Sequence, residues 1–198
     1  MEILINWDTN WLLFFNGLHT PFLDSIMWFF SQSKVWIPLY LAIFAFIFRK
    51  LNLREASFAL LLLLLVVGLA DLISVKLFKE VFQRLRPSHN PEISGLLHLH
   101  KYNDGQFYTG GLYGFVSSHA ANTFALASFT SLIFKIKPYS ILIITWAVIV
   151  SYSRIYLGVH YPFDILGGAI LGTIIALLFY YLFNFVLKKW PDLKLTPP

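Results

Sequence analysis

The sequence predicts an all-α protein that forms an integral membrane helical bundle of five or six transmembrane helices. Of the 198 residues, 58% are hydrophobic and only 13% are charged, and the mean hydropathy is +0.68. A soluble domain of this length cannot bury that much apolar surface around one core. The run from Ala56 to Phe78 is nearly all apolar, and it exceeds the roughly 20 residues needed to cross hydrocarbon.

Four more segments are apolar enough to complete a core of five spans. They are Val35 to Phe48, Phe115 to Phe134, Tyr139 to Tyr156 and Phe163 to Leu187. Polar turns at residues 135–138 and 158–162 separate the last three segments. The first segment is short for a span, and Trp36 provides an interfacial anchor for it.

The segment before residue 35 has two possible structures. Asn16-Gly17 and Pro21 interrupt the apolar stretch from Trp7 to Phe30. An amphipathic interfacial helix followed by a short tilted helix fits this pattern, and so does a kinked sixth span. The chain therefore divides into an N-terminal region of interfacial or short helices, a transmembrane core and a cytoplasmic tail, at residues 1–34, 35–187 and 188–198.

The basic residues predict the orientation of the chain in the membrane. The net charge is +5, but no basic run is long enough to form a patch that binds nucleic acid. The positive-inside rule places residues 49–54 in the cytoplasm. The same topology brings the other basic clusters to that side: Lys135, Lys137, Lys188, Lys189 and Lys194. We therefore expect a multi-pass protein of the inner (cytoplasmic) membrane, with residues 79–114 and His160 on the non-cytoplasmic side.

The sequence predicts no metal site. There is no cysteine, so disulfides and thiolate ligands are excluded. The long polar loop from Ser88 to Gly114 contains His98 and His100, a spacing that two metal ligands can share. Nothing in the sequence places these histidines on a common face with an acidic residue, and histidines that face solvent or lipid headgroups are commoner.

The first of three polar clusters on the non-cytoplasmic side contains Lys79 and Arg86. If the helix continues past residue 79, these cations lie about two turns apart and share a face until Pro87 stops the helix. A lysine and an arginine supply the point charge and the bidentate fork that bind phosphate. Taken alone, the pair fits snorkelling cations at a helix end better.

Asp71 lies about two turns inside Lys79, where a carboxylate is costly in lipid, so we expect it to have a polar partner within the bundle.

The second cluster comprises Ser117, Ser118 and His119, at the start of the next span. Hydroxyl residues at such a position are typical helix caps. The N-terminus of a helix also binds anions, because its free N–H groups and its dipole favour phosphate oxygens.

The third cluster joins Arg154, His160 and Asp164. Pro162 suits the first turn of the final helix, which places Asp164 just inside it and His160 just before it. The carboxylate can then accept from one ring nitrogen of His160 and leave the other nitrogen as a nucleophile or base. A structural Arg–Asp pair beside a bystander histidine is the less favoured interpretation of this spacing.

Together the three clusters resemble the type 2 phosphatidic acid phosphatase superfamily. The matching motifs are Lys79-x6-Arg86-Pro87, Ser117-Ser118-His119 and Ser153-Arg154-x5-His160-x3-Asp164. In the middle motif the family usually has Pro-Ser-Gly-His, so Ser118 replaces a glycine. The resemblance covers Ala56 to about Leu187.

The resemblance implies a two-step phosphoryl transfer without a metal or another cofactor. His160 would attack phosphorus, Asp164 would hold its tautomer, and His119 would exchange protons with the leaving group and with water. The phosphate oxygens would be bound by Lys79, Arg86, Arg154, Ser117 and the backbone N–H of Ser118.

These features predict a membrane-embedded phosphatase that acts on a lipid phosphate or pyrophosphate. Undecaprenyl pyrophosphate is the favoured substrate. The resemblance implies it, because many small bacterial members of the family act on it. Three cations and a helix N-terminus can also neutralise more charge than one monoester carries. Phosphatidylglycerol phosphate, phosphatidic acid and the phosphates of lipid A remain alternatives. A lipid transporter without chemistry, or a structural membrane subunit, represents a different class of function.

The orientation can be tested with a single cysteine, because the native chain has none. We expect Asn103→Cys to react with a membrane-impermeant maleimide in intact spheroplasts, whereas a cysteine in place of Lys137 should react only after lysis. The opposite labelling pattern would invert the predicted topology.

Overall fold

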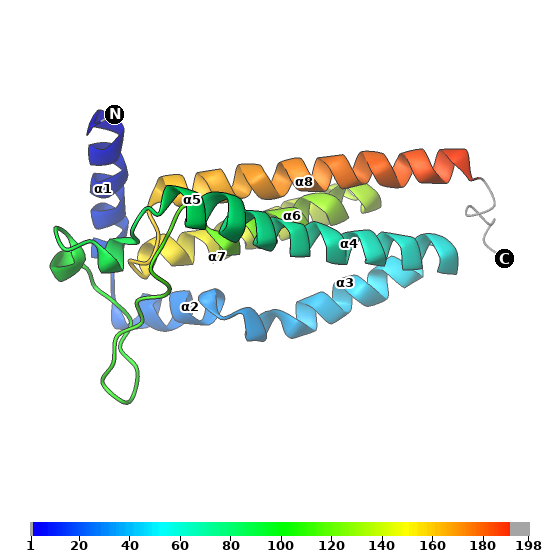
Figure 1. Ribbon diagram of the computed structural model, residues 1–198. Helices are drawn as coiled ribbons and strands as arrows, with labels where there is room; N and C mark the ends of the chain where they lie inside the picture. The colour runs from blue at the N-terminus through cyan, green and yellow to red at the C-terminus, as the bar shows by residue number, and fades with distance from the viewer. Residues whose placement is uncertain (1, 191–198) are drawn as a thin grey trace.

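The computed structural model describes residues 2–190, which form an elongated bundle of helices (Figure 1). Its α-helices are α1 (Glu2–Gly17), α2 (Pro21–Ser31), α3 (Ile37–Lys50), α4 (Leu53–Ile73), α5 (Glu80–Phe82), α6 (Ser118–Phe134), α7 (Lys137–Tyr156) and α8 (Pro162–Lys189). Short helical turns at Ser33–Trp36, Ser74–Lys79, Pro87–His89 and Ser94–Leu96 join them. No strand occurs among residues 2–190 apart from two isolated bridges. The predicted all-α membrane bundle is confirmed.

Three helices within the described chain are long and apolar enough to cross a membrane by themselves: Leu53–Phe82, α7 and α8. The helix pair Pro21–Ser31 and Ser33–Lys50 is bent by 67° and adds a fourth if it counts as one span. The sequence predicted five or six. The difference arises partly at α6, whose 17 residues correspond to about 26 Å. It lies between α4, α7 and α8, so its neighbours cover it.

The N-terminal region forms two separate helices. In Figure 1, α1 lies across the end of the bundle, whereas α2 leads into α3. The outer side of α1 exposes apolar side chains, including Ile3, Trp7, Trp11 and Phe14, as in a helix that lies in the membrane interface. Residues 191–198 of the predicted cytoplasmic tail, with Lys194, lie outside the described residues.

Small residues allow α6 and α8 to pack closely. A Cβ atom added at Gly168 would lie 2.4 Å from the carbonyl oxygen of Ser117, and one at Gly172 would lie 2.1 Å from that of Ala121. Glycines one turn apart are a common means of bringing membrane helices together. The start of α6 and the start of α8, which carry His119 and Asp164, therefore come within reach of each other.

The helix that carries Lys79 ends at Phe82 and does not extend to Arg86, so the condition under which these two cations would share a helix face is not met. Gln83 adopts a left-handed conformation with φ of 47° and turns the chain back. Leu85 then pairs with Tyr113 in an antiparallel bridge, and the Arg86 N–H donates to the carbonyl of Leu112 at 3.0 Å. A turn and a long-range pairing place Arg86, so it occupies a loop rather than a helix face.

The close packing of α6 and α8 predicts that alanine destabilises the protein at Gly172 but not at Gly68. Gly172→Ala should lower the free energy of unfolding by about 2 kcal/mol, because the new methyl group meets backbone atoms that cannot rotate away. Gly68→Ala is the matched control, since a Cβ there meets nothing within 4 Å and alanine favours the helix. Thermal unfolding in detergent measures both, and equal midpoints would contradict the packing argument.

Candidate active site

His160 and Asp164 form a buried pair at the junction of α7 and α8. Gly158, with φ of +70°, turns the chain after α7, and Pro162 starts α8 with Tyr161 as its N-cap residue. The Nδ1 atom of His160 lies 3.1 Å from Asp164 Oδ2, which also accepts from the Tyr161 N–H at 3.1 Å. Within the described chain, His160 Nε2 is buried and has no hydrogen-bond partner. The geometry predicted from the spacing is present.

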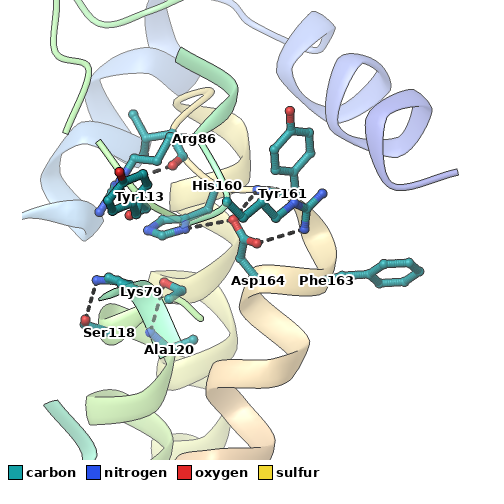
Figure 2. Close-up of polar contacts among 12 residues, drawn as sticks. Lys79, Arg86, Tyr113, Ser118, Ala120, His160, Tyr161, Phe163 and Asp164 are labelled. Carbon is teal, nitrogen blue, oxygen red and sulfur yellow. Dashed lines mark hydrogen bonds and ion pairs between the residues drawn. The ribbon is translucent and has the colours of Figure 1, made fainter. Parts of the chain in front are cut away.

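Three cations surround the imidazole of His160. Burial lowers the pKa of His160 well below its ordinary range, and the neighbouring cations lower that pKa further: Arg86, Arg154 and Lys79. Figure 2 shows Arg86 on one side of the ring and Lys79 with Ser118 on the other. At neutral pH the imidazole is therefore uncharged, and a neutral Nε2 carries the lone pair that a nucleophile needs.

Arg86 is fixed by carbonyl groups of two loops. Its Nε donates to the carbonyl of Tyr113 at 3.2 Å and its Nη1 to that of Val159 at 3.4 Å. Burial and the nearby Arg154 lower the pKa of Arg86 to about 10, so the guanidinium stays charged. Gly110, with φ of +68°, lies so close that a Cβ would be 2.6 Å from Arg86 Nη1. The polar loop therefore wraps tightly around this arginine.

Arg154, in the last turn of α7, is almost fully buried. Its Nη2 donates to the hydroxyl of Tyr108 at 2.6 Å, and its Nη1 donates to that of Ser31 at the end of α2. No local signal in the sequence points to these two partners, because both are remote from Arg154 along the chain. They hold the buried guanidinium at the end of α7, where its charge lowers the pKa of His160.

Lys79 and Ser118 are in direct contact. The Nζ atom of Lys79 donates to Ser118 Oγ at 2.6 Å, and that oxygen lies 2.7 Å from Ser74 Oγ. Ser117 is the N-cap of α6: its hydroxyl accepts from the Ala120 N–H at 3.5 Å, and its own N–H donates to the carbonyl of Asp164 at 2.9 Å. The hydroxyl of Ser118, at the position where the family motif usually has glycine, thus holds the ammonium group of Lys79 in place.

A cavity of about 620 Å³ opens beside the second residue of α6, His119. Its wall is mostly apolar, with contributions from Trp36, Leu63, Val67 and Trp146. The same wall includes Asp71, whose Oδ1 accepts from Asn122 Nδ2 at 3.1 Å. Asn122 is thus the polar partner of Asp71, but Asp71 is exposed and does not lie in the interior of the bundle as expected. The cavity joins the polar site to an apolar space between the helices.

Residues 59–188 match the model of the PAP2 superfamily. The chain belongs to this superfamily. A lipid A 4'-phosphatase from Bacteroides thetaiotaomicron is 39% identical to it over 184 residues, which cover 92% of this chain and 79% of the relative. An undecaprenyl-diphosphatase from Sulfolobus acidocaldarius is 31% identical over 170 residues, 84% of this chain and 73% of that relative.

A solved structure agrees with this assignment. The crystal structure of a transmembrane PAP2 type phosphatidylglycerolphosphate phosphatase from Bacillus subtilis matches with a TM-score of 0.68 and 26% sequence identity. The match covers 96% of this chain and 88% of that one. The resemblance inferred from the three motifs is confirmed, and this PAP2 protein is a membrane lipid phosphatase.

Two polar residues of this PAP2 site were missed in the sequence. Arg84 donates from Nη1 to Asp164 Oδ1 at 2.9 Å and from Nη2 to Asp8 Oδ2 at 2.7 Å. Arg84 lies two positions before Arg86, and a third cation in the segment that carries Lys79 and Arg86 is the signal that could have identified it. Asp8 lies in α1, before the matched region, and carries no local signal.

The histidines of the polar loop have other partners. His98 Nε2 lies 3.0 Å from Asp24 Oδ2, and the His98 ring stacks on that of His19. His100 stacks on Trp28 with ring centroids 3.8 Å apart. Among residues 2–190, no group of three or more histidine, aspartate or glutamate side chains could hold a metal ion. These histidines therefore attach the loop to α2.

Proposed function

We propose that this protein hydrolyses a phosphate monoester of lipid A, or of a closely similar saccharide lipid, and releases inorganic phosphate through a phosphohistidine at His160. The observation that carries the proposal is the unpartnered, buried Nε2 of His160, with Asp164 on the opposite ring nitrogen and three cations around the ring. A neutral nitrogen in a ring of positive charge suits a nucleophile for a phosphate dianion, because the cations bind the oxygens while phosphorus is attacked.

In the first step, Nε2 of His160 attacks phosphorus in line with the bond to the lipid oxygen. The N–P bond forms as that P–O bond breaks. His119, which takes up a proton once the phosphate dianion has neutralised the cations around it, donates that proton to the departing oxygen. The non-bridging oxygens are bound by Lys79, Arg86 and Arg154. Asp164 accepts the Nδ1–H of His160 and stabilises the positive charge that develops on the ring.

In the second step, water replaces the histidine. His119, now neutral, takes a proton from the water as its oxygen attacks phosphorus and the N–P bond breaks. Inorganic phosphate leaves, His160 returns to its neutral form, and His119 is again protonated. The two reaction steps use only side chains of this protein, and each side chain returns to its starting protonation state.

The cavity beside His119 suits the lipid part of the substrate. Its apolar wall between the helices can receive an acyl chain, because burial of a chain there avoids water as the bilayer does. The Asp71–Asn122 pair in the wall offers hydrogen bonds that a sugar or an amide can use and that a prenyl chain cannot.

The comparison with relatives supports lipid A over the undecaprenyl pyrophosphate that the charge count favoured. The lipid A 4'-phosphatase is more similar to this chain, and over more of its length, than the undecaprenyl-diphosphatase. The three cations still suit a pyrophosphate, which therefore remains the second candidate. Phosphatidylglycerol phosphate ranks below both, because the phosphatidylglycerolphosphate phosphatase from Bacillus subtilis is only 26% identical to this chain. Phosphatidic acid has no support beyond the superfamily.

The site is proposed to face the non-cytoplasmic side of the inner membrane. His160 lies near the start of α8, whereas Lys188 and Lys189 lie at its end. Lys135 and Lys137 flank the turn between α6 and α7, at the end of α6 away from His119. The basic residues and the site thus occupy opposite ends of the bundle, as the positive-inside rule requires for an outward-facing site.

The nucleophile can be identified by trapping the phosphoenzyme. His160→Ala should lower turnover by at least about 10³-fold and abolish an acid-labile, alkali-stable phosphoprotein, because no other group replaces Nε2. Asp164→Asn should also lower turnover severely, since the carboxylate charge is lost at nearly constant volume. The reactions are run in EDTA, and the exposed His19→Ala is the matched control. Wild-type turnover of His160→Ala, or loss of wild-type activity in EDTA, would contradict the mechanism.

A substrate panel tests the choice of lipid. In one detergent, purified protein should hydrolyse lipid A with a kcat/KM at least about tenfold above that for undecaprenyl pyrophosphate, because hydrogen bonds to sugar and amide groups raise specificity. Phosphate release measures the rates, with phosphatidylglycerol phosphate and phosphatidic acid in parallel. A preference for undecaprenyl pyrophosphate would reject the lipid A proposal and leave the phosphohistidine mechanism in place.

A further inference from the structure

Asp164 has partners on both carboxylate oxygens. Its Oδ2 contacts His160 Nδ1 and the Tyr161 N–H, each at 3.1 Å. Its Oδ1 accepts from Arg84 Nη1 at 2.9 Å. The carboxylate is fully buried, so its negative charge needs a cation at close range. Arg84 provides that cation on the side of the carboxylate away from the histidine.

Arg84 is itself held in place on two sides. Its guanidinium carbon lies 3.9 Å from the centroid of the Tyr161 ring, a stacking contact that arginine makes well. Its Nη2 donates to Asp8 Oδ2 at 2.7 Å. One nitrogen therefore contacts the carboxylate of α8 and the other contacts that of α1, which fixes the plane of the fork.

Asp8 joins α1 to the start of α8. Its Oδ1 accepts from the Phe163 N–H at 2.8 Å, one of the first N–H groups of α8, which have no partner within the helix. Burial raises the pKa of Asp8, whereas the Phe163 N–H and Arg84 act in the opposite direction. Asp8 is fully buried, and it lies outside the matched residues 59–188.

We propose that Arg84 and Asp8 are positioning residues for the phosphatase reaction, with Arg84 orienting Asp164 against His160 and Asp8 orienting Arg84. This inference rests on the proposed roles of His160 and Asp164. Without Arg84, the Asp164 carboxylate keeps a buried oxygen without a partner and is free to rotate, so the His160 tautomer is less well fixed. Helix α1 thereby contributes to catalysis through Asp8 without touching the substrate.

The test compares Arg84→Gln, Arg84→Lys and Asp8→Asn with wild type. We expect Arg84→Gln to lower kcat by about 10- to 100-fold, as for groups that orient a reactive ligand, with little change in KM, because the phosphate-binding cations remain. Arg84→Lys should recover part of the loss, since one charge is restored without the fork. Asp8→Asn should cause a smaller loss of kcat. Lys76→Gln is the control, because Lys76 is an exposed cation of the same segment, paired with Glu80.

Double variants separate positioning from general support of the fold. In an Asp164→Asn background, Arg84→Gln should cost almost nothing more, because the carboxylate that it orients is gone. The inference would be overturned if the double variant lost kcat by the product of the two single losses. It would also be overturned if Arg84→Gln raised KM at constant kcat. If Arg84→Gln does not yield folded protein, Arg84→Lys and Asp8→Asn give the same comparison.

The outcome for Asp164→Asn alone distinguishes this inference from the proposed function. If Asp164→Asn is severely impaired and Arg84→Gln and Asp8→Asn both turn over like wild type, only the positioning roles are rejected. If Asp164→Asn is itself fully active, the proposed dyad fails, and the positioning roles fail with it.

Discussion

The rest of the site depends on the hydrogen bonds and the ion pair that the Asp164 carboxylate makes. A buried negative charge is tolerated only when hydrogen bonds and cations replace water around it, and here His160, Arg84 and the Tyr161 N–H do so. The backbone of the same residue accepts from the Ser117 N–H, which ties α6 to α8. Four parts of the chain thus meet at one residue: the turn before α8, the segment after α5, the start of α6 and, through Arg84, helix α1.

The membrane imposes the second constraint, because polar chemistry must be confined to one end of an apolar bundle. The helices meet this condition by placing reactive groups at their ends, where free backbone N–H groups also favour anions. Close approach of α6 and α8 at Gly168 and Gly172 brings two of these ends together. The mostly apolar cavity beside His119 then joins the site to an apolar space between the helices. A phosphate can be handled at the boundary while its lipid stays among the helices.

The cations have two electrostatic consequences. They lower the pKa of His160, which keeps the proposed nucleophile uncharged, and they leave an excess of positive charge that a phosphate dianion can neutralise. Ser118 alters how one of these cations is held. Where the family motif has a glycine that lets the backbone approach phosphate, the Ser118 hydroxyl contacts Lys79. Serine at position 118 therefore positions the Lys79 ammonium group through its side chain, in addition to any contact of its backbone N–H with phosphate.

The sequence alone determined the helical membrane bundle and the pairing of His160 with Asp164, because apolar run length and a spacing of one helical turn are local properties. It also named the three cations around His160, which are Lys79, Arg86 and Arg154, but it did not name Arg84. Only the tertiary structure decided that Arg86 leaves the helix, since that follows from the turn at Gln83 and the bridge between Leu85 and Tyr113. The partners Asp8, Ser31 and Tyr108 were likewise decided only in three dimensions. Their contacts join segments far apart in the chain, and the periodicity of a single sequence carries no information on such pairs.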